Sequence, residues 1–527
     1  MSSNTSQTRL VLECCGYAVL SLVGSAVLAA LTRIPAPYSH DQFSYLLLGD
    51  TFASGRPANP TPPFWEHFET FHVLFEPTYV SKYPVMQGLF LALGQVLSGA
   101  PILGVWISTA LLCAATYWML RGWLPAGWAR VGAAVGLLQW GIVGYWAQSY
   151  WGGAAAALGG CLVIGALPRL IKNPTLGLAI TFGVGSAVLA NSRPLEGVIL
   201  FGWVTAAILV ALARRPAVRV LFQNRSLPAL VVLGLTTLLA MASYNQATTG
   251  TATQMPYQLH SALYKNTTFI PFKAPPVEPE YRREIVRDFY REWSGEYMKD
   301  MRRPWFFFTE AVIKAANLMM FFTGVTGFIA LLALPKLWKE RRYRWGLCTV
   351  SSVLGVAFLT RGFPHYVAPV GPLILLLYIA ALAAVTEIDR PFLRGRFLVR
   401  VSLAVISASF VVRLGLHAGD FQPYRAFRQD RARVVATLAE TPKPDLVFVR
   451  YEEGHDPHQE WVFNGASLPN SEIIWALDLG PEANARLLGA FGDRSTWLLT
   501  VSPTADSDSV NELVSLIPYD ADEDETG

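Results

Sequence analysis

The chain has 527 residues, of which 52% are hydrophobic and 15% charged, and its formal net charge is +4. A soluble domain carries about a quarter charged residues, so this composition excludes an ordinary soluble enzyme and indicates a membrane protein with many spans. The five cysteines lie in or beside apolar runs without metal-ligand spacing, and they predict neither a metal site nor a disulfide framework.

Apolar runs long enough to cross a bilayer recur along the chain. The first exceeds the apolar core of a secretion signal, so we interpret it as a retained span. The run at 84–97 is only about 14 residues long, which predicts an interfacial helix instead. The fold is therefore expected to be mainly α, a polytopic membrane protein with about 11 transmembrane helices. These are expected at 11–34, 101–120, 131–147, 151–168, 175–192, 196–213, 227–246, 308–334, 345–360, 366–386 and 397–416.

Basic residues predict the orientation of the spans. One set of loops holds 17 Lys and Arg, whereas the short loops that alternate with them hold two. Because short cytoplasmic loops collect basic residues, the N-terminus is expected in the cytoplasm and the chain from 417 onward outside. The basic set comprises 121–130, 169–172, 214–225, 336–344 and 390–400, and the other set comprises 147–152, 192–197 and 361–366.

Three parts of the chain are predicted: a transmembrane domain at 1–416, a small extracytoplasmic α/β domain at 417–504 and an acidic, disordered tail at 505–527. The transmembrane domain has two long outer loops, 35–100 and 247–307. Periodicity in the α/β domain predicts a helix, two strands, a helix and a strand, in that order. Their expected ranges are 424–440, 446–450, 473–476, 481–491 and 495–501.

Asp41 follows the first span, at the beginning of a predicted helix. An ionisable side chain at a membrane edge is costly to leave unpaired, so such residues tend to mark sites. Tyr45 lies one helical turn further on and is expected to face the same groove, where it orients Asp41 or stacks on a substrate. The alternative is that Asp41 only caps the helix, which taken alone is the commoner role for an acid before an apolar run.

Four further residues on the predicted outer face complete a candidate substrate site: Lys82, Arg193, Arg361 and His365. Basic side chains at outer helix ends run against the bias of membrane proteins. A lone outer Arg usually reaches to lipid headgroups, whereas a set of cations suits a phosphate-bearing lipid. A carboxylate that takes a proton from an acceptor, with cations that neutralise a departing phosphate, fits sugar transfer from a polyprenyl phosphate.

The segments HDQFSYLLLGD at 40–50 and SKYPVMQGLFLALG at 81–94 resemble the first outer loop of the GT-C class of integral-membrane glycosyltransferases. The likeness is to the branch with the aminoarabinose transferases, the protein O-mannosyltransferases and related bacterial enzymes, and in layout it covers residues 8–416. It implies that Asp41 is the catalytic base and that Lys82 lies near the donor phosphate. The common Asp-Glu pair is replaced here by His40 before and Gln42 after the acid, so no metal or other cofactor is expected.

The predicted function is therefore inverting transfer of a hexosyl or pentosyl group from a polyprenyl-phosphate donor to a hydroxyl or amine, on the outer face of a bacterial inner membrane. The acceptor, whether lipid, glycan or protein, is left open; membrane lipids are expected partners and nucleic acid is not. A non-catalytic transporter or flippase would need charged residues in its spans, and 131–168 contains none. A cell-envelope scaffold remains a third interpretation.

Two groups of residues are weaker candidates for metal sites. The acids and histidines between 66 and 76 match no zinc or calcium spacing, and a solvated loop helix is the favoured interpretation. His455 and His458 flank Pro457, which favours a loop turn. Trp146, Tyr150 and Trp151 suit either an interfacial aromatic belt or a sugar site.

Overall fold

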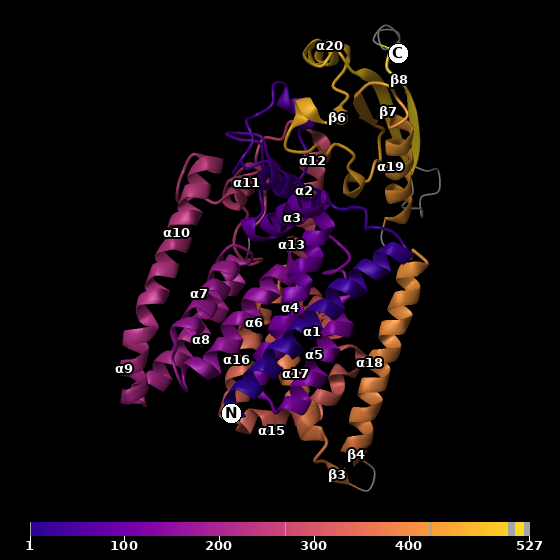
Figure 1. Cartoon of the computed structure of the whole chain (residues 1–527). Helices are drawn as coiled ribbons and strands as arrows, with labels where there is room; N and C mark the ends of the chain where they lie inside the picture. The colour runs from indigo at the N-terminus through magenta and orange to yellow at the C-terminus, as the bar shows by residue number, and fades with distance from the viewer. Residues whose placement is uncertain (1, 269, 391–392, 421–423, 504–511, 521–527) are drawn as a thin grey trace.

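The computed structural model describes residues 2–268, 270–390, 393–420, 424–503 and 512–520 (Figure 1). A bundle of long helices forms one end of the molecule and the C-terminal α/β domain forms the other. The short helices of the two long loops lie between them, and the N-terminus lies at the end of the bundle remote from the α/β domain.

The bundle is centred on α6 and α17, whose apolar windows are 83% buried, whereas α10 stands at an edge with 0% buried. Helix α6 fits at the centre of the bundle because its Gly and Ala residues let neighbouring helices approach closely. The helices of the bundle are α1 Ser2–Leu31, α4 Pro101–Trp123, α5 Ala126–Gly136, α6 Gly153–Leu170, α7 Leu176–Ala190, α8 Pro194–Ala213, α9 Pro216–Arg225, α10 Leu227–Thr249, α14 Pro304–Thr323, α15 Leu334–Lys339, α16 Arg341–Phe358, α17 Gly371–Val385 and α18 Gly395–Ala418. Shorter pieces are η2 Leu137–Gly141, η4 Val325–Ala333, η5 Ala368–Val370, β3 Asp389–Arg390 and β4 Leu393–Arg394.

Eight helices in the described ranges are long and apolar enough to cross a membrane, so the mainly α membrane fold is confirmed but the predicted count of eleven is not. The apolar run at 131–147 is split, because α5 gives way to the π-helical turn η2, which ends at Gly141. The run at 175–192 forms α7, which has 15 residues. The run at 345–360 belongs to α16, whose first turn is rich in Arg.

The two long loops fold into short elements above the bundle. Helix α2 crosses the interfacial helix α3 closely: a Cβ on Gly88 would lie 2.4 Å from Leu48 Cγ, and a Cβ on Gly49 would lie 2.7 Å from Leu91 Cβ. Glycine at both positions therefore allows the helices to meet, and α3 confirms the short helix expected at 84–97. The elements are α2 His40–Ala53, η1 Trp65–Phe68, β1 Val73–Leu74, β2 Val80–Ser81, α3 Val85–Ser98, α11 Pro256–Tyr264, α12 Glu284–Asp288, η3 Phe289–Glu296 and α13 Tyr297–Asp300.

The C-terminal domain is a four-stranded sheet in the order β6-β5-β7-β8. Strand β5 is parallel to both β6 and β7, and β8 is antiparallel to β7. The domain contains α19 Arg425–Leu438, β5 Asp445–Tyr451, η6 Pro457–Gln459, η7 Leu468–Asn470, β6 Ile473–Leu477, α20 Pro481–Ala490, β7 Ser495–Pro503 and β8 Glu512–Pro518. Each of the five elements expected here is present, and the small α/β domain is confirmed.

Strand β8 corrects the prediction of a disordered tail. Residues 512–518, ELVSLIP, are largely apolar and pair with most of β7, from Pro503 opposite Glu512 to Trp497 opposite Pro518. The pairing satisfies backbone groups that a disordered segment would leave to water. The rest of the predicted tail, 505–511 and 521–527, lies outside the described residues.

Candidate active site

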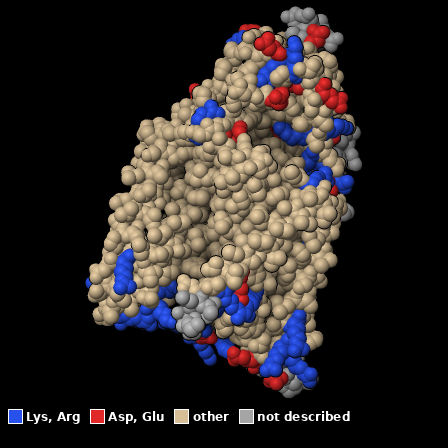
Figure 2. Space-filling model, in the orientation of Figure 1, with Lys and Arg blue, Asp and Glu red and all other residues tan. Residues whose placement is uncertain are grey.

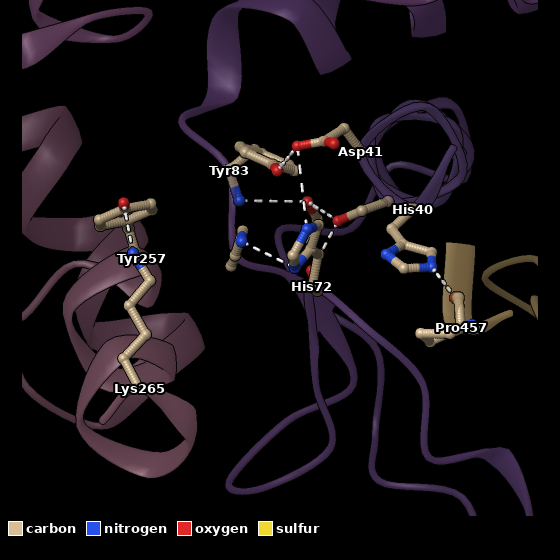
Figure 3. A network of polar contacts seen from close by, with 10 residues as sticks. His40, Asp41, His72, Tyr83, Tyr257, Lys265 and Pro457 are labelled. Atoms are coloured by element: carbon tan, nitrogen blue, oxygen red, sulfur yellow. Dashed lines mark hydrogen bonds and ion pairs between the residues drawn. The ribbon is translucent and has the colours of Figure 1, made fainter. Parts of the chain in front are cut away.

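Asp41 lies in the first turn of α2, and its carboxylate is not used to cap that helix. The N-cap residue is Ser39, whose carbonyl accepts from the Phe43 N–H at 3.2 Å. The Tyr83 hydroxyl donates to Asp41 Oδ1, and His72 Nε2 lies 4.0 Å from the same oxygen (Figure 3). With a side chain 25% exposed, the carboxylate is held in place yet accessible.

Two tyrosines form the wall beside this carboxylate. The rings of Tyr45 and Tyr83 stack at 4.3 Å between centroids, so Tyr45 contacts the residue that donates to Asp41. Burial raises the pKa of Tyr45 to about 12, and burial together with the charge of Asp41 raises the pKa of Tyr83 well above its ordinary value. Both phenols therefore stay protonated near neutral pH, and Tyr83 acts as a donor to Asp41.

Lys82 is buried at 5% exposure, and its Nζ lies 5.1 Å from the centre of the Tyr83 ring. Its Nζ is 2.8 Å from His72 Nδ1. Burial and the charge of Lys82 lower the pKa of His72, so the imidazole is neutral and accepts at Nδ1, which leaves its proton on Nε2, the nitrogen nearest Asp41. Burial, reinforced by the charge of Lys265, lowers the pKa of Lys82 well below that of an ordinary lysine.

The second long loop brings residues that sequence reasoning missed. Lys265 Nζ donates to the Tyr257 hydroxyl at 2.8 Å, and this pair faces the Asp41 group in Figure 3. His260 is buried, and its ring lies 6.0 Å from that of His72. Tyr257 and His260 are three residues apart on α11, so their side chains share one face of the helix. This spacing is a sequence signal from which the pair could have been predicted to lie together. The sequence does not single out Lys265, because it lies in a long loop and the distribution of basic residues is informative only in short loops.

Arg193 and His365 lie together at the bundle side of this region. The Arg193 guanidinium sits over the Tyr366 ring at 4.6 Å. Burial first, and the charge of Arg193 second, lower the pKa of His365, whose Nδ1 is 3.1 Å from the Tyr145 hydroxyl. Arg193 also opposes the rise in the pKa of Tyr45, so its charge acts on the tyrosine that stacks on Tyr83.

Arg361 has different neighbours. Its guanidinium lies over the rings of Trp293, at 3.7 Å, and Tyr297, at 4.3 Å, and it donates to the Trp293 carbonyl. These contacts attach the loop after α16 to the η3 and α13 segment. The structure does not bring Arg361 into contact with Asp41 or Lys82, and its role in substrate binding stays a prediction.

The weaker candidates have other partners. Glu69 accepts from the Tyr264 hydroxyl, Glu66 pairs with Arg282, and His458 Nδ1 lies 3.0 Å from Asp456 Oδ1. Within the described ranges, no three His, Cys, Asp or Glu side chains are arranged to hold a metal ion. Trp146 is fully buried in the bundle core, which suits packing better than either role expected of it.

The assembled site joins an accessible carboxylate to cations that come from separate segments. The Asp41 carboxylate is partly exposed and does not cap α2, so it can accept a proton from a bound hydroxyl or amine. Lys82, Lys265 and Arg193 bring positive charge to the region around Asp41 and the two tyrosines, which suits an anionic group. This combination fits proton abstraction coupled to departure of a phosphate.

The fold is similar to solved membrane glycosyltransferases. No family model and no curated protein matches the sequence. ArnT, the aminoarabinose transferase of Cupriavidus metallidurans, bound to undecaprenyl phosphate, superposes with a TM-score of 0.54 at 14% identity, covering 95% of this chain and 97% of that chain. Its apo form gives 0.52 at 14% identity, covering 93% of each chain. The apo oligosaccharyltransferase of Archaeoglobus fulgidus gives 0.50 at 10% identity, covering 94% of this chain and 69% of that one. The chain is thus a membrane protein with the fold of the GT-C glycosyltransferases.

Proposed function

We propose that this protein transfers a sugar, hexosyl or pentosyl, from a polyprenyl-phosphate donor to a hydroxyl or amine of an acceptor. The observation that carries the proposal is the state of Asp41, a carboxylate held by Tyr83 and free of capping bonds, with buried Lys82 close by. The similarity to ArnT, a structure solved with undecaprenyl phosphate, supports a lipid-linked donor.

In this reaction, Asp41 takes the proton of the acceptor group as its oxygen or nitrogen attacks the anomeric carbon. The bond between that carbon and the phosphate oxygen breaks, and its electron pair leaves with the phosphate. The products are a glycosylated acceptor and a polyprenyl phosphate with one more negative charge, which Lys82, Lys265 and Arg193 neutralise. A single displacement inverts the anomeric centre.

The site is proposed to face the outside of the membrane, which in a bacterium is the periplasmic side of the inner membrane. On the face shown in Figure 2, Lys and Arg gather at the lower end, remote from the C-terminal domain, below a broad uncharged belt. Cytoplasmic ends of membrane proteins carry this excess of basic side chains. The orientation puts the N-terminus in the cytoplasm and the C-terminal domain outside.

The test uses membranes that contain the wild type, Asp41→Asn or Glu76→Gln, supplied with a panel of polyprenyl-phosphate sugars radiolabelled in the sugar. Asn keeps an oxygen that accepts from Tyr83 but is no base, so transfer should fall about 10²- to 10⁴-fold. Glu76 is an exposed acid of the same outer loop and serves as the matched control. Binding of undecaprenyl phosphate should persist in all three proteins.

If Asp41→Asn retained sugar transfer, Asp41 would not be the catalytic base. Movement of intact donor across vesicle membranes, with no new glycosidic product, would instead support the transporter alternative. In that case the cations would serve to bind the phosphate during passage.

A further inference from the structure

The C-terminal domain packs against the face of α2 that lies behind Asp41. Phe43 of α2 stacks on Phe463 at 4.5 Å, with the ring planes 9° apart. His40, the neighbour of Asp41, donates from Nε2 to the Pro457 carbonyl at 2.6 Å. Burial lowers the pKa of His40 to about 3, so this imidazole is neutral and its donor is fixed by the carbonyl. One end of α2 is therefore attached to the 456–466 segment of the domain.

Asp50 attaches the other end of α2 to the same segment. Its Oδ2 accepts from the Ala466 N–H at 2.6 Å, and its Oδ1 accepts from Gln95 of α3 at 2.8 Å. A Cβ on Gly465 would lie 2.8 Å from Asp50 Oδ2, so a larger residue there would displace the Asp50 carboxylate from its present position. Because both ends are held, α2 can neither rotate nor slide without breaking contacts with the C-terminal domain.

A second connection reaches the loop that carries Lys265. Glu460 is buried at 1% exposure, accepts from the Tyr451 hydroxyl and the Val462 N–H, and pairs with Arg283 at 3.4 Å. Arg283 directly precedes α12 and also donates to the Glu69 carbonyl at 2.7 Å. It thus joins the C-terminal domain to both long loops of the site.

Further bonds carry this attachment towards Lys265. The Tyr281 hydroxyl donates to the carbonyl of Tyr264, which is the last residue of α11 and the neighbour of Lys265. The Tyr264 hydroxyl in turn donates to Glu69 Oε1 at 3.1 Å. Removing one member of a buried ion pair leaves an uncompensated charge, so loss of Glu460 should release Arg283 and this chain of contacts.

We propose that the C-terminal α/β domain is a positioning element of the active site, acting through two residues. Asp50 holds α2 and so places Asp41, while Glu460 holds the 247–307 loop and so places Lys265. The inference rests on the proposed function, because it assigns the domain the task of setting the distance between the base and the phosphate-binding cations. Such sites lose rate steeply when a reacting group is displaced by about 1 Å.

The experiment compares Asp50→Asn in α2 and Glu460→Gln in the C-terminal domain, both in the full-length protein, with control changes of the same kind at exposed residues of the C-terminal domain, Asp493→Asn and Glu453→Gln. Asp50→Asn should lower kcat about 10- to 100-fold, with the donor KM within about twofold of the control. Glu460→Gln should raise the donor KM about tenfold. A loss of folded protein lowers the total rate but leaves KM unchanged, so partial misfolding of the variant cannot produce this rise in KM. Glu460→Asp keeps the charge but shortens its reach, and it should show a smaller rise if Glu460→Gln fails to fold.

Hydrogen exchange supplies a readout independent of catalysis. Amides of α2 should exchange faster in Asp50→Asn alone, and amides of α11 should exchange faster in Glu460→Gln alone. Kinetic constants that match the controls, or exchange that rises throughout the protein, would overturn the proposal. If the wild type transfers no sugar, the proposed function fails, and the exchange data still decide whether the domain holds the two segments.

Discussion

Replacing Tyr83 by Phe tests how Asp41 is held. The change removes the hydroxyl that donates to Asp41 Oδ1 but keeps the ring, so the stack on Tyr45 at 4.3 Å survives. His72 Nε2 lies 4.0 Å from that oxygen, too far to replace the lost hydrogen bond. The carboxylate then loses the donor that fixes its direction.

The expected loss follows from the strength of that hydrogen bond. A hydrogen bond to a charged group contributes about 1.5–3 kcal/mol, which at about 1.4 kcal/mol per factor of ten corresponds to a kcat about 10- to 100-fold lower.

The assay is transfer of radiolabelled sugar by purified protein over a range of pH, normalised to folded enzyme. Tyr17→Phe is the control, because it removes a phenol whose partner is the Arg130 carbonyl, outside the site. A Tyr83→Phe enzyme with wild-type kcat would show that Tyr83 does not position the base.

Three further outcomes are expected. The donor KM of the wild type should rise as pH is raised through the lowered pKa of Lys82, because the uncharged amine no longer attracts phosphate. Lys82→Arg stays charged over this range, so its donor KM should not change with pH. Lys265→Ala should raise the donor KM about tenfold relative to exposed Lys273→Ala, measured by the same transfer assay. Burial by itself raises the pKa of Asp420, but the hydrogen bond and charge of Arg428 outweigh it, and the pKa is lowered from 3.8. The Asp420 carboxylate therefore stabilises the folded protein fully above pH 3.8, and this stabilisation is lost as pH falls through the lowered pKa. Asp420→Asn should be about 3–5 kcal/mol less stable at pH 7, because Arg428 is then buried without the Asp420 carboxylate. Thermal unfolding measures this difference.

The proposed chemistry depends on three segments that meet only in the folded chain. Helix α2 brings Asp41, the turn before α3 brings Lys82 and Tyr83, and α11 with the residue after it brings His260 and Lys265. Each segment by itself contributes one or two of these residues, and each of them alone would have an ordinary structural interpretation. Their meeting is what distinguishes a site for acid–base chemistry from a helix cap and a few snorkelling cations.

Some properties of this protein follow from the sequence alone because they depend on neighbours along the chain. The length of apolar runs establishes a membrane protein, and alternation of apolar residues with turn residues establishes the elements of the α/β domain. The position of Asp41 directly after the first span indicates a site for the same reason, since depth in the membrane is set by distance along a helix. Tyr45 follows from helical spacing.

Only the tertiary structure decides which distant residues surround that acid. Tyr83 is 42 residues from Asp41, and no period links the two positions. The predicted span count is not confirmed at the apolar run that continues through the π turn η2, because hydropathy does not detect a break in backbone hydrogen bonding. Strand β8 forms because β7 offers a partner edge, and Arg361 lies away from the carboxylate because two aromatic rings hold it elsewhere. Contacts between segments far apart in the chain depend on packing, which local sequence patterns do not encode.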